Sequence, residues 1–205
     1  MIKKVFIFMF LFILLFILLE QEFVFGQEDV CYCNSCDDCT NKLKNQSCKI
    51  VKLEEDIFNY RYYDDYSCIR FAESNKILDC DGKKIIRSVR LGDGIKIKFQ
   101  KRNNTIKNCI IEGHNRGIYI MYSNNNTLIN NTIRNNRNGV VLGGGEYNSI
   151  INNTIENNIR RGIRLLGAST NALKNNTVIN NGHEGIRLEE YSDHNTLENN
   201  TLKNN

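Results

Sequence analysis

Between residues 94 and 205 the apolar positions fall into short groups that return every 22 or 23 residues. Each return begins with a glycine followed by two aliphatic residues on either side of a variable one. Two further units follow, each containing asparagine, a small or polar residue and an aliphatic residue. The five opening glycines are Gly94, Gly117, Gly139, Gly162 and Gly185. A fixed period of this length indicates a solenoid.

The spacing inside each repeat predicts three short strands and no helix. Apolar residues lie two apart within a unit, which is the strand period, and no unit is long enough for an amphipathic helix. The aliphatic residues of the second and third units are five positions apart in every repeat, as in Ile106 and Ile111. One straight strand would place such a pair on opposite faces. We therefore expect a corner between them, where asparagine tolerates a left-handed backbone.

Stacked coils of this kind place the same repeat position in one column, at a spacing of about 4.8 Å. Asparagine side chains in such a column can hydrogen-bond to one another as a ladder. A leucine-rich repeat has a similar length but needs more leucines and a helical return, so a parallel β-helix is the favoured interpretation. The expected structural ladder consists of Asn131, Asn153, Asn176 and Asn200.

The alternation of Gly-Ile-x-Leu and Asn-Asn-Thr-Ile units resembles the repeats of NosD-type periplasmic proteins and of the wider group of carbohydrate-binding and sugar-hydrolase β-helices. The segment Leu78-Asp79-Cys80-Asp81-Gly82 is similar to a first-coil signature of such proteins. The resemblance covers residues 68–205 and implies an all-β, single-stranded, right-handed parallel β-helix of about six coils. It implies little about activity, because the same coil carries lyases, hydrolases and phage adhesins.

The amino terminus has the proportions of a secretory signal peptide. A short basic head precedes the apolar run Val5–Leu19, so we expect residues 1–26 to direct export. An uncleaved signal anchor is the alternative, and it is the one expected route to a membrane. The predicted organisation is then a cysteine-rich cap or irregular first coil over 27–67 and repeats over 68–205, with truncation at the carboxyl end as an open alternative. We expect the protein to be secreted, periplasmic or on the cell surface.

The chain has eight cysteines, and outside the cytosol cysteines usually form disulfides. A disulfide-tied cap is favoured over a zinc site, because a second distant pair of ligands is not apparent. Repeat alignment places Cys80 and Cys109 in one column on neighbouring coils, within reach of a disulfide, although two buried thiols fit equally well. The connectivity of the other candidates stays open: Cys31, Cys33, Cys36, Cys39, Cys48 and Cys68.

The variable residue of the glycine unit is expected to point outward, so one column can form a surface stripe. Four of its six members are basic and one is aromatic, with Val141 completing the column. Such a stripe suits an extended acidic polysaccharide, and the alternative is a charged face that prevents aggregation. A net charge of +4 does not favour a nucleic-acid partner. The candidate ligand-binding residues are Arg70, Lys96, Tyr119, Arg164 and Arg187.

No catalytic, metal or cofactor residues are assigned from the sequence. Acidic residues gather only around Asp79, Asp81 and Asp93, and the three histidines lie on different coils or corners. The copper association of NosD-type proteins is implied by the resemblance alone. We expect a non-catalytic exported module that recognises glycans or serves as an envelope scaffold. A polysaccharide lyase or glycosidase is the alternative, and a copper-associated protein the third. The last coil is also a candidate for edge-to-edge stacking with a partner.

Overall fold

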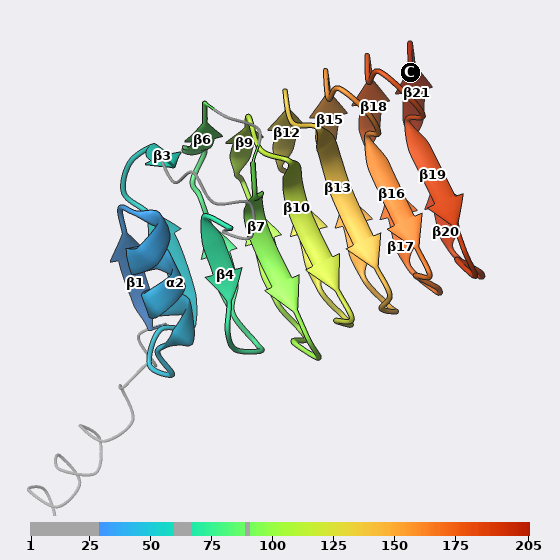
Figure 1. Cartoon of the computed structure of the whole chain (residues 1–205). Coiled ribbons are helices and arrows are strands. Elements are labelled where there is room, and N and C mark those ends of the chain that lie inside the picture. The colour runs from blue at the N-terminus through green and yellow to red at the C-terminus, as the bar shows by residue number, and fades with distance from the viewer. Residues whose placement is uncertain (1–28, 60–66, 89–90) are drawn as a thin grey trace, which may run out of the picture.

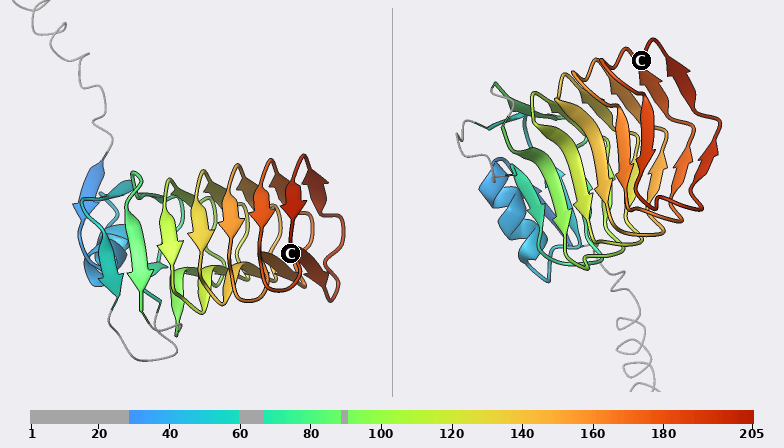
Figure 2. Two further views of the ribbon diagram at one scale, coloured as in Figure 1. Left: turned by 90° about the horizontal axis from the view of Figure 1, so that it is seen from above. Right: turned by 45° about the vertical axis from the view of Figure 1, so that its right-hand side comes forward.

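The computed structural model describes residues 29–59, 67–88 and 91–205 as a stack of parallel coils closed at one end by a helix (Figure 1). Within these residues three parallel sheets run along the stack, with eight, six and seven strands. The chain visits the three sheets in turn, so each complete coil contributes one strand to each sheet, and the strands at the two ends of the stack account for the unequal numbers (Figure 2). The predicted right-handed parallel β-helix is confirmed.

Sheets A, B and C are named here in the order in which the chain first enters them. Sheet A contains β1 (Val30–Cys33), β2 (Ile50–Leu53), β5 (Ile77–Asp79), β8 (Thr105–Lys107), β11 (Thr127–Ile129), β14 (Ser149–Ile151), β17 (Ala172–Lys174) and β20 (Thr196–Glu198). Sheet B contains β3 (Ile57–Asn59), β6 (Lys84–Arg87), β9 (Ile110–Glu112), β12 (Thr132–Arg134), β15 (Thr154–Glu156), β18 (Thr177–Ile179) and β21 (Thr201–Lys203). Sheet C contains β4 (Ile69–Phe71), β7 (Asp93–Lys98), β10 (Arg116–Met121), β13 (Asn138–Gly143), β16 (Ile163–Leu166) and β19 (Ile186–Glu189).

The cysteine-rich segment contains the helix α2 (Cys36–Lys44), which the sequence interpretation missed. Ser35 caps it, since its side chain accepts a hydrogen bond from the N–H of Asp38. Acidic residues in the first turn and basic residues in the last turn suit the helix dipole. The helix buries Cys36, Cys39 and Leu43 against the first coil, and so covers one end of the solenoid core (Figure 1).

The cap segment also supplies strands of the first coil. Strand β2 pairs with β5, and β3 pairs with β6, both in parallel. The structure therefore has about seven turns rather than the six counted from the repeat. The signal peptide expected over 1–26 lies outside the described residues. Among the residues that are described, no helix has the length and apolar character that crossing a bilayer requires.

All eight cysteines are in disulfides, as expected for a protein outside the cytosol. Three bridges tie the cap together: Cys31 to Cys48, Cys33 to Cys39, and Cys36 to Cys68. The fourth joins Cys80 to Cys109 across a Cα distance of 4.7 Å. Of the two interpretations of this pair, the disulfide is therefore the one observed.

The expected corners are present, and the residue at each corner has a positive φ. Asn108 lies between the buried Ile106 and Ile111 with φ 55°. Asn130, Asn152, Asn175 and Asn199 occupy the same place in later coils, with φ between 53° and 55°. The left-handed residue lets two side chains five positions apart point into the same core.

Three asparagine ladders run through the solenoid, one at each corner. In the second ladder Asn153 Oδ1 accepts from both the N–H and the side-chain amide of Asn131 at 2.9 and 3.0 Å. Asn153 in turn donates to Asn176 Oδ1 at 3.1 Å and to the carbonyl of Leu128 at 3.0 Å. Every rung thus satisfies buried polar groups of the coil before it. The complete ladders are Asn104-Asn126-Asn148-Asn171-Asn195, Asn131-Asn153-Asn176-Asn200 and Asn136-Asn158-Asn181-Asn205.

The repeat glycine is explained by a close approach between coils. A Cβ atom on Gly139 would lie 2.5 Å from the carbonyl oxygen of Gly162 and 2.6 Å from Ile155 Cγ2. Contacts this short do not occur in folded proteins, so any larger residue would push the coils apart. The glycine is therefore required for close packing between coils.

Candidate functional site

The outer face of sheet C gathers the predicted stripe in register. Strand pairing aligns Arg70 with Lys96, Lys96 with Tyr119, and Arg164 with Arg187. Val141 stands between Tyr119 and Arg164 in the same column. Sequence spacing therefore placed the column correctly, while the environment of each side chain came from residues outside the column.

The first cluster on this face is built around a buried carboxylate. The side chain of Asp93 is 1% exposed and accepts from Lys96 Nζ at 2.9 Å. It also accepts from Arg116 Nε at 2.5 Å and from Arg116 Nη2 at 3.1 Å. The Arg116 guanidinium lies 3.7 Å from the centre of the Tyr119 ring, a cation–π contact. Burial raises the pKa of the Tyr119 hydroxyl.

Lys96 therefore differs from the free surface cation that its position suggested. Only 5% of the residue is exposed, and its ammonium group is paired with Asp93. Its alkyl chain packs on the sheet while the charge is held in a fixed place. Arg70, at the start of the column, is exposed on β4, and its backbone N–H donates to Thr40 of the cap helix at 3.1 Å.

The second cluster joins three arginines to two glutamates at the other end of the face. Glu189 accepts from Arg164 Nη2 at 2.7 Å and from Arg187 Nε at 2.5 Å. Glu184 accepts from Arg161 Nε at 3.1 Å and also from Arg187. Because three guanidinium groups face two carboxylates, the cluster keeps one positive charge in excess.

Hydrogen bonding keeps both glutamates of this cluster ionised. A hydrogen bond from its own backbone N–H, together with one from Arg187, lowers the pKa of Glu184 to about 2. The pKa of Glu189 is also lowered, chiefly by the hydrogen bond from Arg164. Carboxyl groups that act as general acids need the opposite shift, toward neutral pH.

A nearly uncharged platform separates the two clusters. It lies on β10, β13 and β16, between Arg116 and Arg164. Its outward residues are Tyr119, Met121, Val141, Gly143 and Leu166. The hydroxyl of Tyr119 contacts Met121 Sδ at 3.0 Å, and the same ring lies 3.6 Å from the place of a Cβ on Gly143. Val141 is 4% exposed. The outer face of sheet C is therefore a partly aromatic surface that lies between two clusters of fixed side chains, each with a net positive charge.

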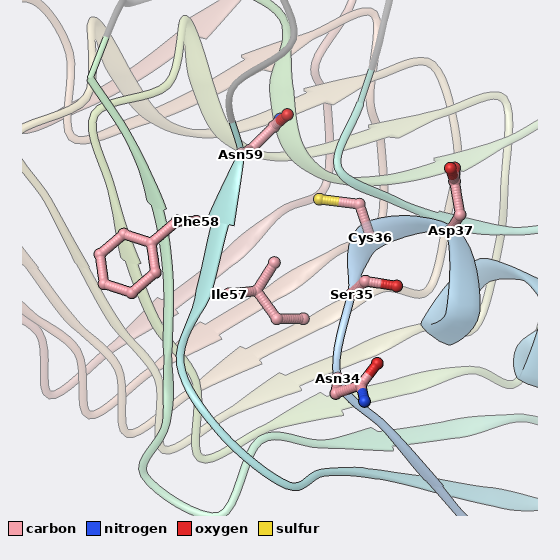
Figure 3. A pocket seen from close by; sticks show the side chains of 7 residues that line it. All are labelled: Asn34, Ser35, Cys36, Asp37, Ile57, Phe58 and Asn59. Carbon is pink, nitrogen blue, oxygen red and sulfur yellow. The ribbon is translucent and has the colours of Figure 1, made fainter.

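One hollow on the described surface lies between α2 and β3. It is lined by cap residues from Asn34 to Asp37 and by Ile57 to Asn59 (Figure 3). The sulfur atom at its edge belongs to the Cys36–Cys68 disulfide. The side chain of Phe58 points to the opposite side of β3 from Ile57 (Figure 3). The polar side chains that line this hollow do not converge on one point (Figure 3).

A second hollow lies where β7 and β10 end. Its lining residues are Gln100, Arg102, Tyr122 and Asn124. The outward stripe predicted from the repeat did not include any of them, because they belong to turns whose length and sequence vary between coils. The signal that could have found them is the pair of aromatic residues, Phe99 and Tyr122, at equivalent positions just after two successive glycine units.

Comparison with known families settles the membership of the chain. The profile described as "Periplasmic copper-binding protein (NosD)" matches residues 35–205. The chain belongs to the NosD family. The periplasmic description of the family agrees with the extracytoplasmic location expected from the disulfides. No curated protein sequence matches the chain.

Solved structures similar to this NosD-family chain share its fold. A mutant of the periplasmic alginate epimerase AlgG has a TM-score of 0.59 and 22% identity, over 78% of this chain and 38% of that one. The Dettilon tailspike protein gp208 has a TM-score of 0.56 and 16% identity, over 68% of this chain and 36% of that one. The chain thus spans less than two fifths of the length of either protein.

The described residues of this NosD-family chain do not fit the copper that the family description names. All cysteines are in disulfides, and no group of three or more histidine, cysteine or acidic side chains within the described residues could hold a metal ion. His114 is fully buried, while His183 and His194 are exposed. Copper sites need converging nitrogen or sulfur ligands, and the donor groups of the described residues do not supply such a set.

His114 has a structural place instead. Its Nε2 lies 3.3 Å from the carbonyl oxygen of Ile85, and its N–H donates to Asn136 Oδ1 at 2.9 Å. These are the bonds that an asparagine makes in the third ladder. Burial lowers the pKa of the imidazole to about 4, with Arg87 adding to the shift, so the ring is neutral at pH 7.

Proposed function

We propose that the chain is an extracytoplasmic, non-catalytic module that binds an extended acidic polysaccharide across the outer face of sheet C. One observation carries the proposal: cations outnumber carboxylates in both fixed clusters of this face, around Asp93 and around Glu189. A flat parallel sheet offers the ligand a straight path along the solenoid axis.

The platform between the clusters supports the same conclusion. Sugar rings have apolar faces that pack on aromatic and aliphatic side chains, and Tyr119 and Leu166 lie partly exposed there. Carboxylates or sulfates of the polymer would then meet Arg116 on one side and Arg164 or Arg187 on the other. Because carboxylates already hold these cations in place, binding would cost little additional side-chain conformational entropy.

The protonation states favour binding over cleavage. Glycoside hydrolysis needs a carboxylic acid that stays protonated near neutral pH, facing a second carboxylate. The glutamates of sheet C have lowered pKa values and accept from arginines. His114 is buried inside the solenoid and has no route to a polymer on its surface.

The test measures retention and polymer length together, with the purified chain on a panel of acidic and neutral polysaccharides. Acidic polymers should be retained at unchanged length, and retention should fall as salt rises because the attraction is screened. The double variant Arg164→Glu and Arg187→Glu should lose retention. Lys174→Glu with Lys203→Glu reverses two charges away from sheet C and serves as the matched control.

Three results would contradict the proposal. Shortened polymer would make the chain a polysaccharide lyase or glycosidase. Intact polymer without retention would leave an envelope scaffold as the better description. Equal loss in the control variant would show that net charge, rather than the sheet C face, holds the polymer.

A further inference from the structure

The hollow at the ends of β7 and β10 has features of a preformed ligand-binding site. It measures about 340 Å³ and lies between two stacked turns, one following each strand. The N–H of Phe99 donates to Met121 O at 3.0 Å, and that of Gln100 donates to Tyr122 O at 2.7 Å. Because these backbone N–H and C=O groups are already paired with each other, a ligand in the hollow would contact the side chains.

The Tyr122 ring is placed by the coil that follows it. Tyr122 has φ 47°, and a Cβ at Gly144 would lie 2.6 Å from its Cδ1 and 2.7 Å from its Cε1. The ring therefore lies against the bare backbone of Gly144, where any larger residue would displace it. The residue remains 58% exposed, which leaves a supported aromatic surface toward the hollow.

The polar groups of the hollow are mainly donors. Arg102 is exposed, and its guanidinium makes no ion pair with any part of the chain that the structure describes; its backbone N–H donates to Ser74 Oγ at 3.1 Å. Asn124 Oδ1 accepts from the N–H of Glu146 at 2.9 Å, so its amide NH₂ group is the part left for a ligand. Among the described residues that line the hollow, none carries a carboxylate.

An aromatic surface beside a guanidinium and two amides matches a carboxylate-bearing pyranose. The ring can stack on the apolar face of a sugar, the arginine can bind the carboxylate through two parallel hydrogen bonds, and the amides can meet hydroxyl groups. We infer that this hollow binds one hexuronate residue. The inference rests on the proposed function and adds a subsite to it, because Tyr122 directly follows β10, where the sheet C platform ends.

The test uses short oligosaccharides that are too small to span sheet C. Trigalacturonate and its methyl ester differ in charge but hardly in shape, and calorimetry on the full chain compares their dissociation constants. Trigalacturonate should bind at least about tenfold more tightly than the ester, since a hydrogen bond to a charged group contributes more than one to a neutral group.

The variants are chosen to keep the turns folded. Tyr122→Asn removes the ring but tolerates positive φ, and Arg102→Gln removes the charge. Each should weaken trigalacturonate binding by about tenfold. Tyr191→Asn makes the same change at an exposed tyrosine with φ 55° that lies outside the hollow, and it should leave binding unchanged. Circular dichroism of each variant checks the fold.

The outcomes separate this inference from the proposed function. Equal binding of the acid and the ester would overturn the assignment to a hexuronate. Retention of long acidic polymer without any binding of trigalacturonate would overturn the subsite and leave the sheet C proposal standing. Trigalacturonate binding that survives both hollow variants but is lost in the Arg164→Glu and Arg187→Glu variant would move the subsite to sheet C.

Discussion

The first coils and the later coils of the solenoid have different side chains at their buried corners. From Asn126 onward every corner is held by an asparagine rung, repeated with little change to the last coil. At the equivalent positions of the earlier coils stand Lys76, the Cys80–Cys109 disulfide and His114. Lys76 donates from its ammonium group to the carbonyls of Asn45 and Cys48, both at 2.6 Å.

This comparison shows that a ladder needs a different group where it starts. An asparagine rung accepts from the coil before it and donates to the coil after it, and the coils next to the cap do not offer an asparagine partner on both sides. A longer cation reaches the carbonyls of the cap, a disulfide needs no polar partner, and a neutral imidazole replaces one amide donor. Substitutions in each region can measure how far the two differ.

The largest effect is expected in the regular region. Asn153→Ala should lower the free energy of unfolding by about 4 kcal/mol, because it leaves several buried donors and acceptors unpaired. Asn153 is 1% exposed and bonds to Asn131, Leu128, Ile151 and Asn176. Chemical denaturation measures the change. The neighbouring corner residue provides the control: Asn152→Gly keeps the left-handed backbone and should change stability little.

In the irregular region, replacing Cys80 and Cys109 together with alanine should cost about 3 kcal/mol. The bridge spans 29 residues, and its loss frees the unfolded chain as well as leaving space in the core. Denaturation midpoints of the double variant and the parent give the difference. If hydrogen exchange were accelerated in β14 to β18 as strongly as in β5 and β8, the separation between the two regions would be wrong.

His114 should make the irregular region sensitive to mild acid. Its folded pKa of about 4 lies below the ordinary value of 6.5, so the unfolded chain binds the proton more readily. The stabilisation is complete above pH 6.5 and is lost as pH falls toward 4, with roughly 2 kcal/mol gone by pH 4.5. Unfolding free energies measured at pH 7.0 and 4.5 test this.

The variant His114→Asn should remove most of that pH dependence. The carboxylates with lowered pKa values, Asp79, Glu184 and Glu189, contribute stability that is present above their ordinary pKa values and is lost only at lower pH. They therefore do not obscure the window above pH 4.5. An unchanged slope in the variant would exclude the imidazole as its source.

The smallest effect is expected for the exposed ion pair of the regular region. Lys174 Nζ lies 2.7 Å from Glu198 Oε2, but the two side chains are 41% and 50% exposed. Lys174→Met should change stability by less than about 0.5 kcal/mol, and added salt should erase even that difference. A loss above about 1 kcal/mol would mean that surface charge contributes to stacking of the coils.

The fold could be predicted because its signals repeat. One glycine, one odd spacing between aliphatic residues and one asparagine column, each seen several times, were enough to predict strands, corners and register. Only the second ladder was predicted, and the first and third were missed. The asparagines of the third ladder follow the same period but lie outside the strand units that define the repeat: Asn136, Asn158, Asn181 and Asn205. The helix α2 was missed because four closely spaced cysteines mask the short amphipathic pattern of that segment.

The candidate site was predicted less completely, for a physical reason. Sequence spacing fixes which way a side chain points, but the partner that holds it comes from another position of the coil. Asp93 holds Lys96 from three residues away and Arg116 from the next coil, while Glu189 aligns with Leu166 in a neighbouring column that the predicted stripe did not include. The hollow beside Tyr122 depends on Gly144 in the following coil, and that dependence has no counterpart in the other repeats.

The Cys80–Cys109 bridge also has a consequence for biosynthesis. Coils built on identical rungs can be miscounted, since a chain displaced by one whole unit would still find an asparagine at each corner. Only two neighbouring coils carry cysteine at the second corner. The disulfide between them can therefore form only when these two coils stack in the correct register. The bridge thus fixes the register of the coils next to the cap.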